Sequence, residues 1–355
     1  MKRKLSVLIV SFALSSVAGG IEILNKLSQS EMDAIYNEIK TPYKYGVILT
    51  PEKGKMLDNP SVFRHGNKWV MYYIVFDGKG YETHIAESAD LLTWKPLGCV
   101  FKRSDNGAWD SAQADGAPQL LSLDWNGNNE INKYDGKYWM TYIGGAKHGY
   151  ETDPLSIGIA WTQDSLDTAK WSRQDKPILS TSDADVRSFE AKTLYKSYVI
   201  EDEKRRLGYR FVMYYNAKQN GKWVERIGMA VSDDMKNWKR FGIGPCIVNP
   251  ANLDNGISGD PMIRRIGDVF VMFYFGYNWD GKNKPAFDTF AASKDLVNWT
   301  RWEGKALIES TEAWDRTHAH KPWVIKHDGV VYHFYCAVGS QGRVLALATS
   351  KPMQF

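Results

Sequence analysis

Short hydrophobic runs rich in aromatic residues recur along the chain at intervals of 59 to 73 residues. Each run is about five residues long and lacks helical spacing, so it predicts a buried β-strand. The five runs cover residues 69–73, 138–142, 211–215, 270–274 and 331–335.

Further signals surround each run. An Ala-x-Ser/Thr-x-Asp pattern leading to a Trp follows the first four runs, and the fifth keeps only Ala348-Thr-Ser350. Pro60, Pro261 and Pro322 each lie 11 residues before the middle of their run. Each unit therefore reads as a meander of three or four antiparallel strands. Five such units predict an all-β, five-bladed β-propeller over residues 57–355, rather than a solenoid, which uses shorter repeats.

Residues 21–56 lie outside the repeats. A capping Ser28 precedes helical spacing at Met32, Ile35 and Ile39, which predicts a short N-terminal helix. A short strand follows at residues 47–49. Because the fifth repeat ends without an outer strand, this segment is expected to complete it and close the ring.

Residues 1–20 resemble a secretory signal. A basic start is followed by an apolar stretch at residues 5–14 and by small residues at 16–18. The protein is therefore expected to be exported to the periplasm or secreted, and no later stretch is apolar enough to span a membrane.

Charge and composition narrow the function further. Lys and Arg number 45 and Asp and Glu 41, and three of the basic residues lie in the expected signal. This near-neutral balance gives no reason to expect a nucleic-acid partner. The 14 Trp, 19 Tyr and 14 Phe are expected mainly to fill the contacts between sheets. Cys99, Cys246 and Cys336 form neither a disulfide framework nor a common metal site, which predicts free thiols.

Charged residues gather at the starts of the five expected inner strands, which meet at the central channel of a propeller. Carboxylates crowded together have split pKa values, as a paired acid and base require. Glycoside hydrolysis uses such a set. The residues at these starts are Asp58, Asp115, Glu190 and Asp260, with His318, His320 and Lys321 on the fifth strand.

With these motifs the chain resembles the five-bladed glycoside hydrolases of families 43, 62, 32, 68, 117 and 130. Carried over by position from family 43, Asp58 would be the base, Glu190 the third-blade group, Asp260 the proton donor and His320 the axial histidine. The sequence departs from that pattern at Asn59, which separates the first Asp from its Pro, and in the order of Glu and Asp on the third and fourth blades. Either of those two acids could therefore donate the proton.

The resemblance to family 117 rests on a single propeller with an N-terminal helical segment, and it keeps His318 and His320 as candidate acids. Other residues on the same expected face are substrate-binding candidates, because aromatic rings suit sugar C–H faces and Arg suits hydroxyls or acidic sugars. The alternative is that the aromatic residues only pack the loops. This second set comprises Arg187, Tyr81, Trp109, Tyr150, Trp279 and Trp314, with Asp115, His318, His320 and Lys321.

No cofactor is expected to be required, although two ion sites are possible from the residue types. His318 and His320 could hold an axial metal, since they point the same way on a strand. The pattern at residues 124–130, with Asp135, resembles a calcium loop, although a plain polar hairpin is the alternative.

The favoured function is a glycoside hydrolase that cleaves short plant or algal oligosaccharides with inversion. The alternatives are a non-catalytic glycan-binding propeller and a phosphorylase related to family 130. Changing Asp58 or Glu190 to Ala is expected to abolish turnover and to leave the melting temperature nearly intact. The sugar, the linkage and the oligomeric state do not follow from the sequence.

Overall fold

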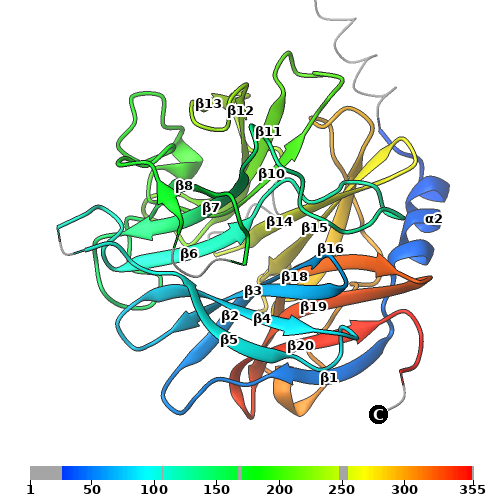
Figure 1. Ribbon diagram of the computed structural model, residues 1–355. Coiled ribbons are helices and arrows are strands. Elements are labelled where there is room, and N and C mark those ends of the chain that lie inside the picture. Colours follow the sequence, from blue (N-terminus) through cyan, green and yellow to red (C-terminus); the bar gives the residue numbers. More distant parts are fainter. Residues whose placement is uncertain (1–25, 106, 167–169, 248–254, 354–355) are drawn as a thin grey trace, which may run out of the picture.

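The computed structural model describes residues 26–105, 107–166, 170–247 and 255–353, so the expected signal at 1–20 lies outside the described residues. The protein is all-β with few helices, and its sheets are arranged as in a propeller (Figure 1). No helix in the described ranges has both the length and the apolar character of a membrane span.

Antiparallel pairing divides the described strands into five groups, here called meanders, and one parallel residue pair joins the first to the second and another joins the third to the fourth. The first meander contains β2 (Met56–His65), β3 (Lys68–Phe76), β4 (Tyr81–Ser88) and β5 (Lys95–Phe101). The second contains β6 (Gln113–Pro118), β7 (Tyr138–Gly145), β8 (Ser156–Thr162) and β9 (Ser172–Arg173). The third contains β10 (Thr193–Glu201), β11 (Phe211–Lys218), β12 (Glu225–Ser232) and β13 (Lys239–Phe241).

The fourth meander contains β14 (Ile257–Ile266), β15 (Val269–Tyr277), β16 (Phe287–Ser293) and β17 (Thr300–Arg301). The fifth contains β18 (His318–His327), β19 (Val330–Gly339), β20 (Gly342–Thr349) and β1 (Tyr43–Leu49). The five aromatic runs lie in β3, β7, β11, β15 and β19, the second strand of each meander. Most of their side chains are buried, and they contribute to the hydrophobic core.

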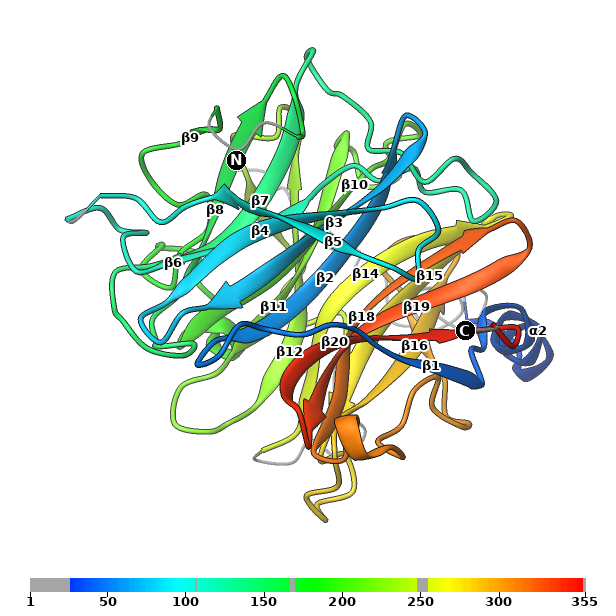
Figure 2. The ribbon, with the colours of Figure 1, turned by 60° about the horizontal axis from the view of Figure 1, so that its bottom comes forward.

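Strand β1 comes from the N-terminal segment and completes the fifth meander. It pairs antiparallel with β20, from Tyr43 opposite Thr349 to Leu49 opposite Leu345, and the two strands run side by side in Figures 1 and 2. The fifth repeat therefore obtains its outer strand from the opposite end of the sequence, as the repeat pattern predicted.

Helix α2 (Gln29–Ile39) packs on the outside of the sheets. Ser28 caps it and forms a capping box with Glu31, and Met32, Ile35 and Ile39 are its buried face. Two 3₁₀ turns, η1 (Ser188–Glu190) and η2 (Ala313–Asp315), precede β10 and β18. The helix is thus attached to the outside of the fold by one apolar face.

Three innermost strands share a local irregularity. Asn59, Asp260 and Lys321 each precede a Pro and have a left-handed backbone, with φ of 44°, 54° and 64°. Each also lies at a shift in the strand register. These bulges place three polar side chains at equivalent positions around one hollow.

Candidate active site

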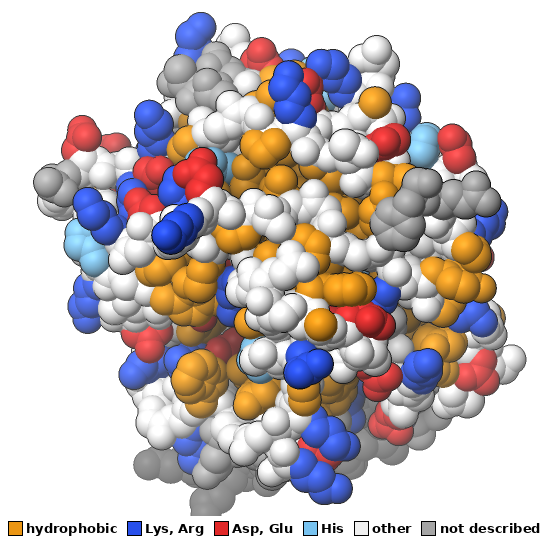
Figure 3. All heavy atoms as spheres, turned by 90° about the horizontal axis from the view of Figure 1, so that it is seen from below, with side chains coloured by type: hydrophobic (Ala, Val, Ile, Leu, Met, Phe, Trp, Pro, Cys, Tyr) orange, Lys and Arg blue, Asp and Glu red, His pale blue; other side chains and the backbone are white. Residues whose placement is uncertain are grey.

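A cavity of about 430 Å³ opens at this end of the inner strands. Its walls combine inner-strand residues with residues from the links that lead to the third strands. The polar and aromatic residues that line it include Asn59, Tyr150, Glu151, Tyr195, Asn216, Lys218, Trp223, Glu225, Asp260, Tyr277, His318, His320, Lys321 and Arg343. Figure 3 shows the protein from below, and on this face Lys and Arg side chains alternate with Asp and Glu and with hydrophobic side chains, in keeping with the near-neutral composition.

Asp58 lies beside the cavity as an ionised group between two cations. Its Oδ2 accepts hydrogen bonds from Nζ of Lys321 and Nη1 of Arg343, both at 2.9 Å. Tyr150 donates to the same oxygen at 3.4 Å, and the backbone N–H of Asn59 donates to Oδ1 at 2.9 Å. Burial would raise the pKa of Asp58, but the two cations outweigh it and lower the pKa below its usual range.

Glu225, the first residue of β12, has a raised pKa, in contrast to Asp58. Its Oε2 accepts from Nδ2 of Asn216 at 2.9 Å, and its Oε1 accepts from Nε1 of Trp223 at 3.0 Å. Burial raises the pKa of Glu225 to about 7, although the hydrogen bond from Asn216 opposes this rise. The cavity wall thus holds a carboxyl group that keeps its proton up to a pH of about 7 and is partly protonated at neutral pH.

Glu151 and Asp260 complete the carboxylates that line the cavity. Nζ of Lys321 contacts Oε1 of Glu151 at 3.2 Å, so this side chain is ion-paired. Asp260 lies near Asn216, whose Nδ2 is 3.5 Å from Oδ1, and its buried Oδ2 has no hydrogen-bond partner among the described residues. Burial raises the pKa of Asp260, against the nearby charge of Lys321.

Asp115 lies behind this wall, on β6, and is 5% exposed. Nδ2 of Asn59 donates to its Oδ2 at 2.8 Å. Burial raises the pKa of Asp115 to about 7, with the charge of Lys321 opposing the rise and that of Asp58 adding to it. The structure therefore brings Asp58, Asp115 and Asp260 together around Lys321, as the inner-strand argument expected.

The two histidines of β18 line the cavity with their rings 5.6 Å apart. Nδ1 of His320 lies 3.1 Å from the carbonyl oxygen of Cys336, and its Nε2 lies 3.3 Å from Nη1 of Arg343. Burial and the Arg343 charge hold the pKa of His320 well below its usual value. Both ring nitrogens already face protein groups, so the axial metal pair with His318 does not fit this arrangement.

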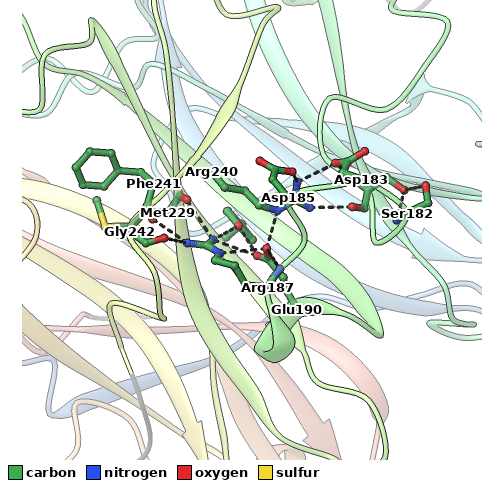
Figure 4. Close-up of polar contacts among 11 residues, drawn as sticks. Ser182, Asp183, Asp185, Arg187, Glu190, Met229, Arg240, Phe241 and Gly242 are labelled. Carbon is green, nitrogen blue, oxygen red and sulfur yellow. Dashed lines mark hydrogen bonds and ion pairs between the residues drawn. The ribbon is translucent and has the colours of Figure 1, made fainter.

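Glu190 and Arg187 lie elsewhere, in and beside η1, and neither lines the cavity (Figure 4). Glu190 accepts from Nε of Arg187 at 3.1 Å, from Nε of Arg240 at 2.6 Å and from the hydroxyl of Tyr215 at 2.5 Å. Burial would raise the pKa of Glu190, but the Arg187 and Tyr215 hydrogen bonds lower it. Glu190 was expected at the start of an inner strand, in one hollow with Asp58. This expectation is wrong, because β10 begins only at Thr193 and Glu190 lies in the preceding turn η1.

Among the five aromatic residues expected at the site, only Tyr150 lines the cavity. Trp109 stacks on Tyr142 at 5.6 Å, and Nε1 of Trp279 donates to the carbonyl of Ile257 at 2.7 Å. Tyr81 is 2% exposed, and Trp314 lies in η2 against the hydroxyl of Tyr335. The other four aromatic residues do not line the cavity, as the alternative of loop packing predicted. They are Tyr81, Trp109, Trp279 and Trp314.

The expected calcium loop is a polar hairpin held by its own side chains. Oδ1 of Asp124 accepts from the backbone of Asn126 at 3.1 Å, and Nδ2 of Asn128 donates to Glu130 at 2.8 Å. Asp135 faces Lys137, at 2.7 Å. These contacts are those of a plain polar hairpin, and a calcium ion at this loop stays a prediction.

Several cavity residues escaped the sequence reasoning, among them Trp223, Glu225 and Arg343. Glu151 lies in Gly149-Tyr-Glu-Thr152, which repeats the motif at residues 80–83 and places it in a link on the expected face, although no role was assigned to it. The repeat alignment could also have placed residue 225 at the start of a third strand, directly after a link.

No family model and no curated protein matches the sequence. Among solved structures, a complex of BT0996 and RGII is 48% identical, with a TM-score of 0.88 over 92% of this protein and 97% of that one. A second structure, named as a glycoside hydrolase, is 47% identical with the same coverage and TM-score. This chain therefore belongs to the glycoside hydrolases and is an enzyme of that class.

More distant structures share the fold. Zg3597, a family 117 glycoside hydrolase from Zobellia galactanivorans, is 12% identical, with a TM-score of 0.61 over 88% of this protein and 91% of that one. Structures from families 43 and 130 also match. The resemblance that the sequence motifs indicated is confirmed.

Proposed function

We propose that this protein is an exported, five-bladed β-propeller glycoside hydrolase that cleaves a glycosidic bond in a plant oligosaccharide related to RGII. The five meanders support the blade count, and the similar BT0996 complex supports the substrate class. The single observation that carries the catalytic proposal is the contrast in one cavity between Glu225, with a pKa of about 7, and the ion-paired Glu151.

In this proposal Glu225 is the general acid, which gives its proton to the glycosidic oxygen as the bond to C1 breaks. Glu151 is the base that takes a proton from the attacking water, which gives inversion. Lys321 holds Glu151 in place, and Asp58 holds Lys321 and Arg343 in turn. Since both oxygens of Asp58 already accept hydrogen bonds from the protein, we assign it this positioning role instead of that of the base.

The experiment that tests this proposal incubates the purified enzyme with an RGII oligosaccharide, with and without inorganic phosphate. Hydrolysis independent of phosphate, with an inverted anomer first seen by NMR, is expected. Binding without cleavage would instead identify a glycan-binding propeller. A sugar phosphate formed only with phosphate would identify a phosphorylase, and a retained anomer would make Glu151 a nucleophile.

The pH dependence of kcat/KM provides a second test. Because Glu225 must carry its proton and has a pKa of about 7, activity should be present below that pH and fall as the pH rises through it. Asp115 also has a pKa of about 7, so the profile should be measured for Asp115→Asn as well. The alkaline limb should persist in this variant, and its disappearance would assign the limb to Asp115.

Trp223 is expected to support the leaving group. This residue is 57% exposed at the cavity wall, and its Nε1 donates to the proposed acid. Trp223→Ala should lower kcat/KM for the oligosaccharide by about 10- to 100-fold, because an exposed ring beside the acid can stack on a sugar. Tyr43→Ala, which removes an exposed ring outside this cavity, is the matched control. Equal losses in both variants would contradict the stacking role.

A further inference from the structure

A second cluster of ligand-type side chains lies outside the cavity, on the outer half of the first meander. Glu82 and His84 belong to β4, and Cys99 belongs to β5. One oxygen, nitrogen and sulfur atom from these residues lie within 4.8 Å of one another, and Sγ of Cys99 is 3.9 Å from Oε2 of Glu82. All three side chains are partly buried, so a small ion can reach them from solvent.

The strands hold these side chains in place. Glu82 and His84 are two residues apart on one strand and therefore point to the same face. Cys99 is the direct partner of His84 across the antiparallel pair. Register shifts on both sides of this pair and the left-handed Gly98 next to it, with φ of 113°, mark a bulged stretch of β5.

A further residue orients the carboxylate of this cluster. Nε of Arg103 lies 3.4 Å from Oε1 of Glu82, which leaves Oε2 directed at the thiol. Arg103 is itself fixed by Asp77, with Nη2 to Oδ2 at 2.7 Å and Nη1 to Oδ1 at 3.1 Å. Metal ligands in proteins are commonly held by outer hydrogen bonds of this kind.

We propose that Glu82, His84 and Cys99 form a binding site for Zn²⁺. Thiolate and imidazole ligands favour Zn²⁺ over Ca²⁺ or Mg²⁺, and a carboxylate completes three of four tetrahedral positions, with water as the fourth ligand. Binding exchanges the thiol proton of Cys99 for the metal and releases that proton to solvent. The ion would tie the outermost strand of the first meander to β4.

The test uses the full-length, tag-free protein after EDTA treatment, titrated with Zn²⁺ by calorimetry. One ion per protein molecule is expected, with a thermal midpoint raised by about 2 °C or more. Co²⁺ should give a sulfur-to-cobalt charge-transfer band. Cys99→Ser and Glu82→Gln should weaken binding by about 10-fold or more, and the cobalt band should vanish in Cys99→Ser.

Cys246→Ser is the matched control, since this other partly buried free thiol contacts only the carbonyl of Ile227 among the polar contacts described for it. It should bind Zn²⁺ like the unaltered protein. The proposal is overturned if the unaltered protein binds no Zn²⁺ or if Cys99→Ser and Glu82→Gln bind as tightly as Cys246→Ser. Loss of binding in His318→Ala, with Cys99→Ser unaffected, would also overturn it, because the ion would then lie in the cavity.

Discussion

Glu225→Gln should lower kcat/KM for the oligosaccharide by about 10³-fold, the range expected when a general acid is removed. The amide has nearly the same shape as the carboxyl group, but it cannot give a proton to the leaving oxygen. Glu225 is 5% exposed, and the replacement removes a buried acid without creating a cavity. The variant should therefore keep its thermal midpoint, which calorimetry can measure beside the kinetics.

Two controls separate a lost acid from a damaged pocket. A substrate with an aryl leaving group of low pKa needs little protonation, so Glu225→Gln should recover most of its activity on it. Asp260→Asn is the matched variant, because Asp260 also lines the cavity and has a raised pKa. If Asp260→Asn shows the 10³-fold loss and Glu225→Gln does not, the donor is Asp260, as the family 43 pattern implied.

The cavity keeps one carboxyl group ionised and another protonated by supplying cations unevenly. Asp58 lies 2.9 Å from two cations, and this keeps it ionised despite burial. Glu225 has no ion pair among the described contacts and receives only neutral N–H groups, from Asn216 and Trp223. Burial acts to raise both pKa values, and the two cations reverse its effect at Asp58 but not at Glu225.

The strands could be predicted from the sequence because the same local signals recur in each repeat. Each aromatic run forms the second strand of a meander, and the unfilled outer position of the fifth repeat predicted the pairing of β1 with β20. Helix α2 could also be predicted, from the capping residue Ser28 and from the spacing of its apolar residues. These features depend on short stretches of sequence, and the packing of the whole protein reinforces them.

The residues of the site were harder to predict from the sequence, because a bulge in an inner strand changes which residue faces the cavity. Asn59, Asp260 and Lys321 are equivalent by backbone conformation and by the Pro that follows each. Asp58 therefore lies one position earlier than the acid of the fourth meander. The third inner strand lacks this Pro, so no signal in the sequence showed that Glu190 lies before the strand begins. Residues such as Glu225 reach the cavity only through the packing of different meanders, which no local pattern predicts.

Glu190→Ala should reduce the free energy of unfolding by about 3 to 5 kcal/mol, because it leaves two arginines without their shared buried carboxylate. Arg187 and Arg240 both contact Oε1 of Glu190, and the Glu190 side chain is fully buried. This reverses the sequence expectation of an inactive enzyme with an unchanged melting temperature. Urea unfolding at pH 7 measures the loss, and kcat of the folded fraction should stay near that of the unaltered enzyme.

The stability contributed by Glu190 should also depend on pH. Its pKa is lower in the folded protein than in the unfolded state, so the contribution is present above the unfolded value and is lost as the pH falls through the folded value. The stability difference between the unaltered protein and Glu190→Ala should therefore shrink in acid. An inactive Glu190→Ala with unchanged unfolding would instead contradict the structural role and favour a role in catalysis.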